Sequence, residues 1–255
     1  MKRPLFPFLE HSRPIPIAHR GGAQEAEENT WAAFERAIML GYRHIETDVQ
    51  ASRDDVAVIF HDDTLERLTG RPEPVGALVW SDLERMSTLG GGRLARLEDV
   101  LSVWPDCYFN LEPKSDAAVS PIAEAVARCN ALDRVCVGSV DQRRVKRLRE
   151  MLGPNLCWSP AHFDVTRLWL AGWGFPMRRF PFPVVQVPRT YGPIEVVTPR
   201  FVDAAHALGI DVHVWTVDAE EEMDEVAELG VDGIMTDRPS LLKEVLQRRG
   251  QWTGA

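Results

Sequence analysis

Short apolar segments alternate with amphipathic segments along the chain, and this alternation predicts its fold. Residues 15–19 form the first apolar segment, and residues 30–40 follow with apolar positions at helical spacing. Further strands are expected at 44–50, 108–112, 135–140, 156–159, 184–187, 212–217 and 233–236. Helical patterns follow at 117–130, 141–152, 163–171, 199–208, 219–229 and 239–249. About eight strand–helix units in a chain near ~250 residues favour a closed (β/α)8 TIM barrel over an open doubly wound sheet.

The region after the second predicted strand departs from this alternation. Residues 56–61 form another β-rich run, and the Asp54-Asp55 pair before it predicts a turn, so the two strands can pair as a hairpin-like extension. Short helices are expected at 81–86 and 97–104, on either side of a run of three glycines. No linker rich in serine, glycine or charge interrupts the chain.

Composition narrows the class of protein. The chain has 255 residues, is 45% hydrophobic and carries a formal net charge of −9, so it is too apolar to be disordered. The negative charge argues against a nucleic-acid partner and against a basic membrane anchor. An anionic small molecule remains an acceptable substrate if cations or a metal line its site.

Nothing in the chain predicts a membrane span or a secretory leader. No run approaches the ~18 apolar residues that a span needs. Pro4, Pro7 and Glu10 interrupt the N-terminal apolar residues, which argues against a leader and favours a cytoplasmic location. The four cysteines lack zinc-site spacing and are expected to be reduced thiols.

Acidic side chains occupy the ends of two predicted strands. Glu46 and Asp48 are two residues apart and therefore share one face of their strand, and Glu112 ends the next strand of the barrel. Three carboxylates at one mouth repel each other unless they are protonated, paired with cations or bound to a metal. Oxygen ligands suit a hard cation such as Mg²⁺ or Ca²⁺. A solvated strand face is the alternative.

Basic residues at neighbouring strand ends suggest phosphate chemistry. His19 and Arg20 follow the first strand, His61 follows the run at 56–61, and Lys114 lies two residues after Glu112. An arginine fork matches phosphate oxygens, and two imidazoles can supply a general acid and a general base. Spacing alone therefore suggests cation-assisted phosphodiester cleavage. The alternatives are hydrogen-bonded or loop-capping histidines and a surface lysine.

Other conspicuous residues have simpler interpretations. His44 shares the face of Glu46 but lies earlier on the strand, so it is expected to be structural, and Trp215 is as well explained by core packing as by a site. The basic run on the helix at 141–152 fits a solvated helix face. The aromatic and proline-rich loop at 172–183 either faces a substrate or partner or packs against the barrel.

Six groups of residues, in order from residue 17 to 239, resemble the motifs of the glycerophosphodiester phosphodiesterase family. They are AHRGG at 18–22 with ENT at 28–30, IETDV at 45–49, FHD at 60–62 with TLER at 64–67, LEPK at 111–114, VWTV at 214–217 and GVDGIMTDRP at 230–239. The resemblance implies a TIM barrel with a small insertion after the second strand, here roughly 62–97, in a single domain over residues 1–255.

The resemblance also implies an activity and a set of site residues. The activity is hydrolysis of glycerophosphodiesters to sn-glycerol 3-phosphate and an alcohol, through attack by the neighbouring glycerol hydroxyl and a cyclic phosphate. The cofactor is one divalent cation, Mg²⁺ or Ca²⁺, with Mn²⁺ as a further candidate. By motif match, the metal ligands are Glu46, Asp48 and Glu112, the acid/base pair is His19 and His61, and the substrate contacts are Arg20, Lys114 and Trp215.

Two departures from the family motifs and two alternative functions remain. Glu27 stands where the family has proline, which predicts an altered loop or an added charge near the metal, and Pro113 removes a backbone donor between Glu112 and Lys114.

The first alternative function is a lysophospholipase D or sphingomyelinase D-like activity, with the loop at 172–183 as the candidate acyl groove. The second is an inactive barrel that binds a ligand. The oligomeric state is left open.

Overall fold

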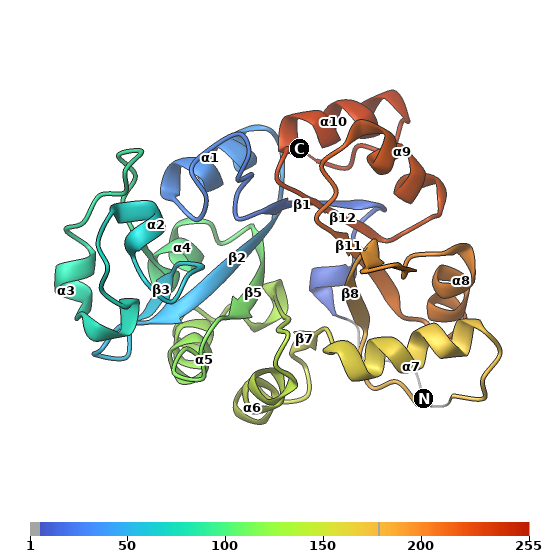
Figure 1. Cartoon of the computed structure of the whole chain (residues 1–255), viewed down its shortest axis with the longest axis horizontal. Coiled ribbons are helices and arrows are strands. Elements are labelled where there is room, and N and C mark those ends of the chain that lie inside the picture. The colour runs from blue at the N-terminus through green and yellow to red at the C-terminus, as the bar shows by residue number, and fades with distance from the viewer. Residues whose placement is uncertain (1–5, 178, 255) are drawn as a thin grey trace.

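The computed structural model describes residues 6–177 and 179–254, and eight parallel strands form its centre (Figure 1). Along the barrel wall the order is β7-β6-β5-β2-β1-β12-β11-β8. The strands are β1 (Ile15–His19), β2 (His44–Ala51), β5 (Tyr108–Pro113), β6 (Val135–Val137), β7 (Cys157–Trp158), β8 (Val184–Pro188), β11 (Asp211–Trp215) and β12 (Gly233–Thr236). The predicted (β/α)8 barrel is confirmed.

The barrel has one seam in its wall. Among the described residues, no ladder joins β7 to β8, the two ends of the strand order. The hydroxyl of Ser159, just after β7, accepts a hydrogen bond of 2.9 Å from the backbone N–H of Gln186 in β8. A side chain thus bridges the seam at one point where backbone pairing is missing.

Helices surround the strands, as their apolar stripes require (Figure 1). They are α1 (Trp31–Met39), α4 (Leu97–Val103), α5 (Val119–Arg128), α6 (Gln142–Leu152), α7 (His162–Gly172), α8 (Pro199–Ala207), α9 (Glu220–Glu228) and α10 (Pro239–Arg248). Side-chain caps start three of them: Thr30 for α1, Asp141 for α6 and Thr198 for α8. No helix in the described ranges has the length and apolarity needed to cross a membrane.

The insertion between β2 and β5 forms a satellite with an apolar cluster of its own (Figure 1). It contains β3 (Ala57–Ile59), α2 (Glu66–Thr69), the 3₁₀ turn Val75–Ala77, α3 (Trp80–Leu83) and β4 (Ala95–Arg96). The expected hairpin-like extension is present, since β3 runs antiparallel to β2. The satellite begins earlier than residue 62, because Val58 and Phe60 are already part of its apolar cluster.

A short antiparallel ribbon follows β8, and the sequence analysis did not predict it. It consists of β9 (Thr190–Tyr191) and β10 (Ile194–Glu195). Each strand has two residues, too few for an alternating pattern to be recognised in the sequence. The ribbon matters because it forms part of the barrel mouth.

The end of the aromatic loop at 172–183 packs against the barrel, whereas Trp173 and Phe175 near its start are more than half exposed. Residue 178 lies outside the described residues. Phe182 is fully buried and Phe180 nearly so, and the ring of Phe182 meets Trp158 edge-on at 5.8 Å. None of its described residues lines the cavity at the barrel mouth. The substrate-facing interpretation of this loop, and with it the proposed acyl groove there, is therefore wrong. The prediction that the N-terminus carries no secretory leader falls partly on residues 1–5, which lie outside the described residues.

The opposite end of the barrel buries histidines that have no role at the mouth. His44 pairs through Nε2 with the carbonyl of Phe8 at 3.0 Å and stacks on Tyr108 at 4.7 Å. His213 is fully buried, and neither of its ring nitrogens has a hydrogen-bond partner. Burial lowers the pKa of His44 to about 3 and that of His213 to about 4, so both are neutral in the fold.

Acidification from pH 7 to pH 5 is expected to lower the free energy of unfolding by roughly 2 kcal/mol for each of His44 and His213. The unfolded chain takes up protons on these imidazoles below their ordinary pKa of 6.5, whereas the folded chain does so only near pH 3 to 4. Stability that is present above pH 6.5 is therefore lost as the pH falls. Urea unfolding curves at the two pH values measure the loss.

The histidine contribution is isolated by comparing variants. His44→Gln should show a smaller change between pH 7 and pH 5 than the parent protein, whatever its stability at pH 7. His162→Gln removes an exposed histidine and should keep the parent's pH dependence. An unchanged pH dependence in His44→Gln contradicts the prediction.

Candidate active site

A tight left-handed turn after β1 positions the first two candidate residues. Arg20, Gly21 and Gly22 all have positive φ, at 51°, 82° and 104°. A Cβ on Gly21 would lie 2.8 Å from the Cβ of Ala33, and one on Gly22 would lie 2.6 Å from Pro239. Only glycine fits both positions, so the turn places His19 and Arg20 close over the barrel mouth.

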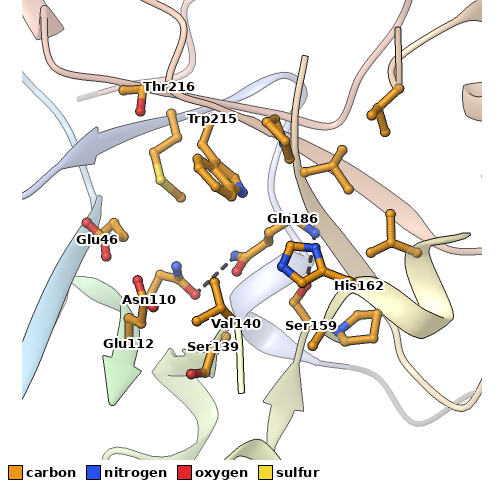
Figure 2. Close-up of a pocket in the computed structure, with 18 of the residues that line it drawn as sticks. Glu46, Asn110, Glu112, Ser139, Val140, Ser159, His162, Gln186, Trp215 and Thr216 are labelled. Carbon is orange, nitrogen blue, oxygen red and sulfur yellow. Dashed lines mark hydrogen bonds between the residues drawn. The ribbon is translucent and has the colours of Figure 1, made fainter. Parts of the chain in front are cut away.

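Strand register brings the three carboxylates together. Glu46 of β2 lies opposite His19 of β1, and Asp48 of β2 lies opposite Glu112 of β5. One oxygen from each of the three carboxylates lies within 4.8 Å of the others. Glu46 and Glu112 lie on the same side of the cavity in Figure 2. The expected convergence at the ends of the strands is therefore observed.

Cationic and amide groups partly balance the carboxylates. Asp48 is buried, accepts a hydrogen bond of 2.9 Å from Asn29, and lies 3.0 Å from the guanidinium Nε of Arg20. The ammonium of Lys114 is 3.5 Å from oxygens of both Asp48 and Glu112. Burial and the charge of Asp48 raise the pKa of Glu46 well above its ordinary range. An all-oxygen donor set with excess negative charge fits a hard divalent cation.

His19 is held by a carboxylate that the sequence analysis did not assign. Its Nδ1 lies 2.6 Å from Asp237, and its Nε2 lies 3.6 Å from Glu46. Burial lowers its pKa, but the charge of Glu46 and the hydrogen bond to Asp237 outweigh burial and raise the pKa overall. Asp218 fixes the loop in turn by accepting the backbone N–H of Asp237 at 2.7 Å. The TD pair of the closing motif was the available signal for Asp237.

His61 is held by a chain of ion pairs that crosses to the turn after β1. Its Nδ1 lies 2.6 Å from Asp62, which pairs with Arg67 at 2.6 Å. Arg67 also binds Glu28 at 2.7 and 3.0 Å, and Glu28 pairs with Arg20 at 3.0 Å. The hydrogen bond from Arg67 lowers the pKa of Asp62 to about 2. The insertion and the barrel are thereby tied together beside His61.

The candidate residues surround one cavity of about 520 Å³. Seven of the eight line it: His19, Arg20, Glu46, His61, Glu112, Lys114 and Trp215. Asp48 lies behind them, with 1% of its surface exposed. Trp215 has 37% exposed and stands at the edge of the cavity across from Glu112 (Figure 2). Core packing alone therefore does not explain this tryptophan.

Glu27 points away from the carboxylate cluster and into the insertion. Its carboxylate accepts hydrogen bonds from the hydroxyl of Thr88, from the N–H of Gly90 at 3.0 Å and from the N–H of Gly92 at 3.3 Å. The alternative of an added charge near the metal is thus not observed. Glu27 instead clamps the glycine run of the insertion to the loop that carries Glu28.

Replacing Glu27 by alanine is expected to lower the free energy of unfolding by about 2 kcal/mol, because charge-assisted hydrogen bonds are lost. The glycine run should also become more sensitive to limited proteolysis. Urea unfolding and timed digestion measure the two effects. Glu66→Ala, an exposed glutamate of the same insertion, is the matched control. A Glu27 variant as stable and as protease-resistant as this control contradicts the clamp.

Comparisons with known proteins agree with the motifs. The model of the glycerophosphoryl diester phosphodiesterase family matches residues 19–241. A Mycobacterium tuberculosis protein named "Probable glycerophosphodiester phosphodiesterase 2" is 38% identical, and the match covers 99% of this chain and 98% of that protein.

Two solved structures share the fold. The glycerophosphodiester phosphodiesterase of Agrobacterium tumefaciens matches with a TM-score of 0.77 at 24% identity, over 91% of this chain and 98% of that one. An Oleispira antarctica phosphodiesterase, solved in complex with the product sn-glycerol-3-phosphate, matches with a TM-score of 0.75 at 20% identity, over 92% of this chain and 97% of that one. At these identities the likeness shows the fold.

Proposed function

Because the chain belongs to the glycerophosphoryl diester phosphodiesterase family, it hydrolyses glycerophosphodiesters, and we propose how its own residues carry out that reaction. The products are sn-glycerol 3-phosphate and an alcohol. The observation that supports the proposal most is the meeting, at one cavity, of three carboxylates, two histidines, one arginine and one lysine.

The carboxylates of Glu46, Asp48 and Glu112 would hold one divalent cation. Their oxygens are close enough together for one ion, and among the described residues the group includes no histidine or cysteine. When bound, the cation neutralises charge that develops on the phosphoryl oxygens. An all-oxygen cluster of this kind suits Mg²⁺, Ca²⁺ and Mn²⁺ alike.

Arg20 and Lys114 bind the phosphate. Both line the cavity, and both already contact carboxylates of the cluster, so their charges are directed to its centre. The planar guanidinium matches two phosphate oxygens, and the ammonium adds a point charge. Trp215 offers an apolar wall for the carbon face of the glycerol.

His19 and His61 transfer the protons. Each ring is fixed through Nδ1 by a carboxylate, Asp237 or Asp62, which leaves each Nε2 for the substrate. One imidazole takes the proton of the glycerol hydroxyl beside the phosphate as its oxygen bonds to phosphorus. The other imidazole gives a proton to the departing alcohol as its P–O bond breaks. Water then opens the cyclic phosphate with the two roles exchanged.

Release of sn-glycerol 3-phosphate from glycerophosphocholine tests this function directly. Assays with Mg²⁺, Ca²⁺ or Mn²⁺ should show turnover with at least one cation, and ³¹P spectra of a reaction slowed by cold should show a transient cyclic phosphate. Absence of turnover with every cation supports the alternative of an inactive barrel that binds a ligand.

A further inference from the structure

Three uncharged polar side chains line the cavity next to the carboxylates, and the reaction proposed above does not use them. Asn110 lies opposite Glu46 in the strand register and two residues before Glu112 on β5. Ser159 follows β7, and Gln186 lies on β8, on the other side of the seam. We call Asn110, Ser159 and Gln186 the polar network, and all three line the cavity.

Hydrogen bonds within the polar network hold it in one arrangement. The amide Nε2 of Gln186 donates to Oδ1 of Asn110 at 3.0 Å (Figure 2). The backbone N–H of Gln186 donates to the hydroxyl of Ser159 at 2.9 Å. Gly138 leaves the room that this amide needs, because a Cβ there would lie 2.7 Å from Oε1 of Gln186. The network is therefore oriented before a ligand binds.

Each member of the network keeps hydrogen-bonding capacity that the protein does not use. Within the described ranges, no acceptor takes the Nδ2 hydrogens of Asn110 or the hydroxyl hydrogen of Ser159, and no donor reaches Oε1 of Gln186. Asn110 is only 4% exposed and Ser159 only 2%. Buried polar groups require partners, so the network indicates a ligand that both accepts and donates hydrogen bonds, as hydroxyl groups do.

Aromatic rings form other walls of the same cavity. Trp169 of α7, Tyr191 of the β9–β10 ribbon and Trp215 all line it. The indole N–H of Trp169 donates to the carbonyl of Glu195 at 3.3 Å, which fixes the ribbon against α7. Aromatic faces pack against the carbon face of a ring, and amides and hydroxyls bind the hydroxyls around its edge. Together these walls suit a polyhydroxylated ring.

The distribution of charge in the cavity favours a neutral ligand at the network. Among the described residues that line the cavity, the permanently charged ones belong to the carboxylate cluster or contact it: Arg20, Glu46, Glu112 and Lys114. Once a cation occupies the cluster, no carboxylate in this set is left for an ammonium group. A quaternary ammonium accepts no hydrogen bond, so it would also leave the donors of Asn110 and Ser159 unpaired.

We propose that the polar network binds the departing alcohol, and that this alcohol is a neutral, polyhydroxylated ring, a sugar or a cyclitol. The inference rests on the proposed function, because the phosphate must lie at the three carboxylates. The attacking hydroxyl and the departing oxygen lie in line on opposite sides of phosphorus. With the glycerol on Trp215, the departing alcohol extends across the cavity, where Figure 2 shows Asn110 and Ser159.

The chemistry of the step is that of the proposed function. The P–O bond to the ring alcohol breaks, and the departing oxygen takes a proton from an imidazole. The phosphate stays on the glycerol as the cyclic ester, which water then opens. The free polyol leaves the network unchanged.

A series of substrates tests the network in the unaltered protein. Four esters of glycerol 3-phosphate carry myo-inositol, glucose through its O6, cyclohexanol or choline as the departing alcohol. The readout is kcat/KM divided by the rate constant for hydroxide-catalysed release of the same alcohol, which corrects for leaving-group reactivity. We expect inositol or glucose to exceed both cyclohexanol and choline by about 10²-fold, because two or more hydrogen bonds to buried groups are gained. The better of the two rings identifies a cyclitol or a sugar.

Variants test whether the network causes this preference. Gly138→Ala adds a methyl group that displaces the Gln186 amide, and Ser159→Ala removes a donor. Each should lower the ratio of kcat/KM for the preferred ring ester to kcat/KM for the choline ester about tenfold. This ratio is independent of the fraction of protein that is folded. Thr166→Ala is the matched control and should keep the parent's ratio, because Thr166 lines the cavity but its hydroxyl already donates to the carbonyl of His162 at 2.9 Å.

Two results overturn the proposal. The first is a cyclohexanol or choline ester that is cleaved as efficiently as the better hydroxylated ring, after correction for leaving-group reactivity. The second is a ratio that stays at the parent's value in both Gly138→Ala and Ser159→Ala.

The proposed function and the polar network fail in different ways. Turnover of all four esters without preference refutes the role of the network and leaves the proposed function intact. Absence of turnover with every ester and every cation refutes the function. In that case calorimetric binding of free myo-inositol and free glucose decides the network: weaker binding of either by Gly138→Ala than by Thr166→Ala supports it, and equal binding of both refutes it.

Discussion

Replacing His19 or His61 by alanine lowers kcat by about 10²–10⁴-fold, the range that a positioned general acid or base supplies. Each imidazole is fixed by one carboxylate and faces the same cavity, so each variant loses one proton-transfer group. Because the two roles exchange between the steps, either loss slows both formation and opening of the cyclic phosphate. Steady-state turnover of glycerophosphocholine at saturating cation measures the effect.

The control for these variants is a histidine of the same cavity. His162 lines it but has no carboxylate partner among the described contacts, so His162→Ala should keep kcat within about twofold. Circular dichroism of all three variants verifies folding. Turnover close to that of the parent in His19→Ala or His61→Ala contradicts the assignment of these histidines as acid and base.

Removing the cation, or a carboxylate that holds it, is the second large effect that we expect. A chelator should abolish turnover, and one added cation should restore it. Glu112→Gln keeps the shape of the side chain but removes a charge, and we expect kcat to fall by at least about 10²-fold at a fixed cation concentration. The parent should also gain thermal stability when the cation is added, because the ion binds only the folded chain.

Competition between a proton and the cation for the Glu46 carboxylate gives a second test of the metal site. Burial and neighbouring charge favour the protonated form of Glu46, and a cation must displace that proton. The cation concentration that gives half-maximal turnover should therefore rise as the pH falls. Glu66→Gln, on the surface of the insertion, should match the parent in every respect. Full activity after exhaustive chelation, or a stability gain that survives in Glu112→Gln, contradicts the metal site.

The sequence predicted the convergence of the three carboxylates because strands impose simple geometry. Period-two spacing put Glu46 and Asp48 on one face, and parallel register then brought Glu112 alongside. The barrel followed from the alternation of segments. The positions of these three carboxylates follow from the strands alone and do not depend on the conformation of any loop.

The partners that hold the histidines and the remaining walls of the cavity depend on contacts between loops, which the spacing of residues in the sequence does not predict. Arg67 reaches Glu28 across 39 positions of the chain, and Asp237 reaches His19 across 218. The aromatic loop at 172–183 looked like a ligand wall from composition alone, yet Phe180 and Phe182 are buried and none of its described residues lines the cavity. The actual wall includes a four-residue ribbon whose pattern is too short to recognise.

The seam between β7 and β8 has a consequence for how such a barrel can diversify. The candidate catalytic side chains come from residues 19–114 together with the closing strands, whereas the uncharged wall of the cavity between residues 140 and 196 comes from both sides of the seam. Among the described residues, side-chain hydrogen bonds cross this seam where backbone pairing is missing, including those between Ser159 and Gln186 and between Trp169 and Glu195. Selection or engineering can therefore reshape the two sides of this uncharged wall separately, while the strands that carry the carboxylates keep their pairing.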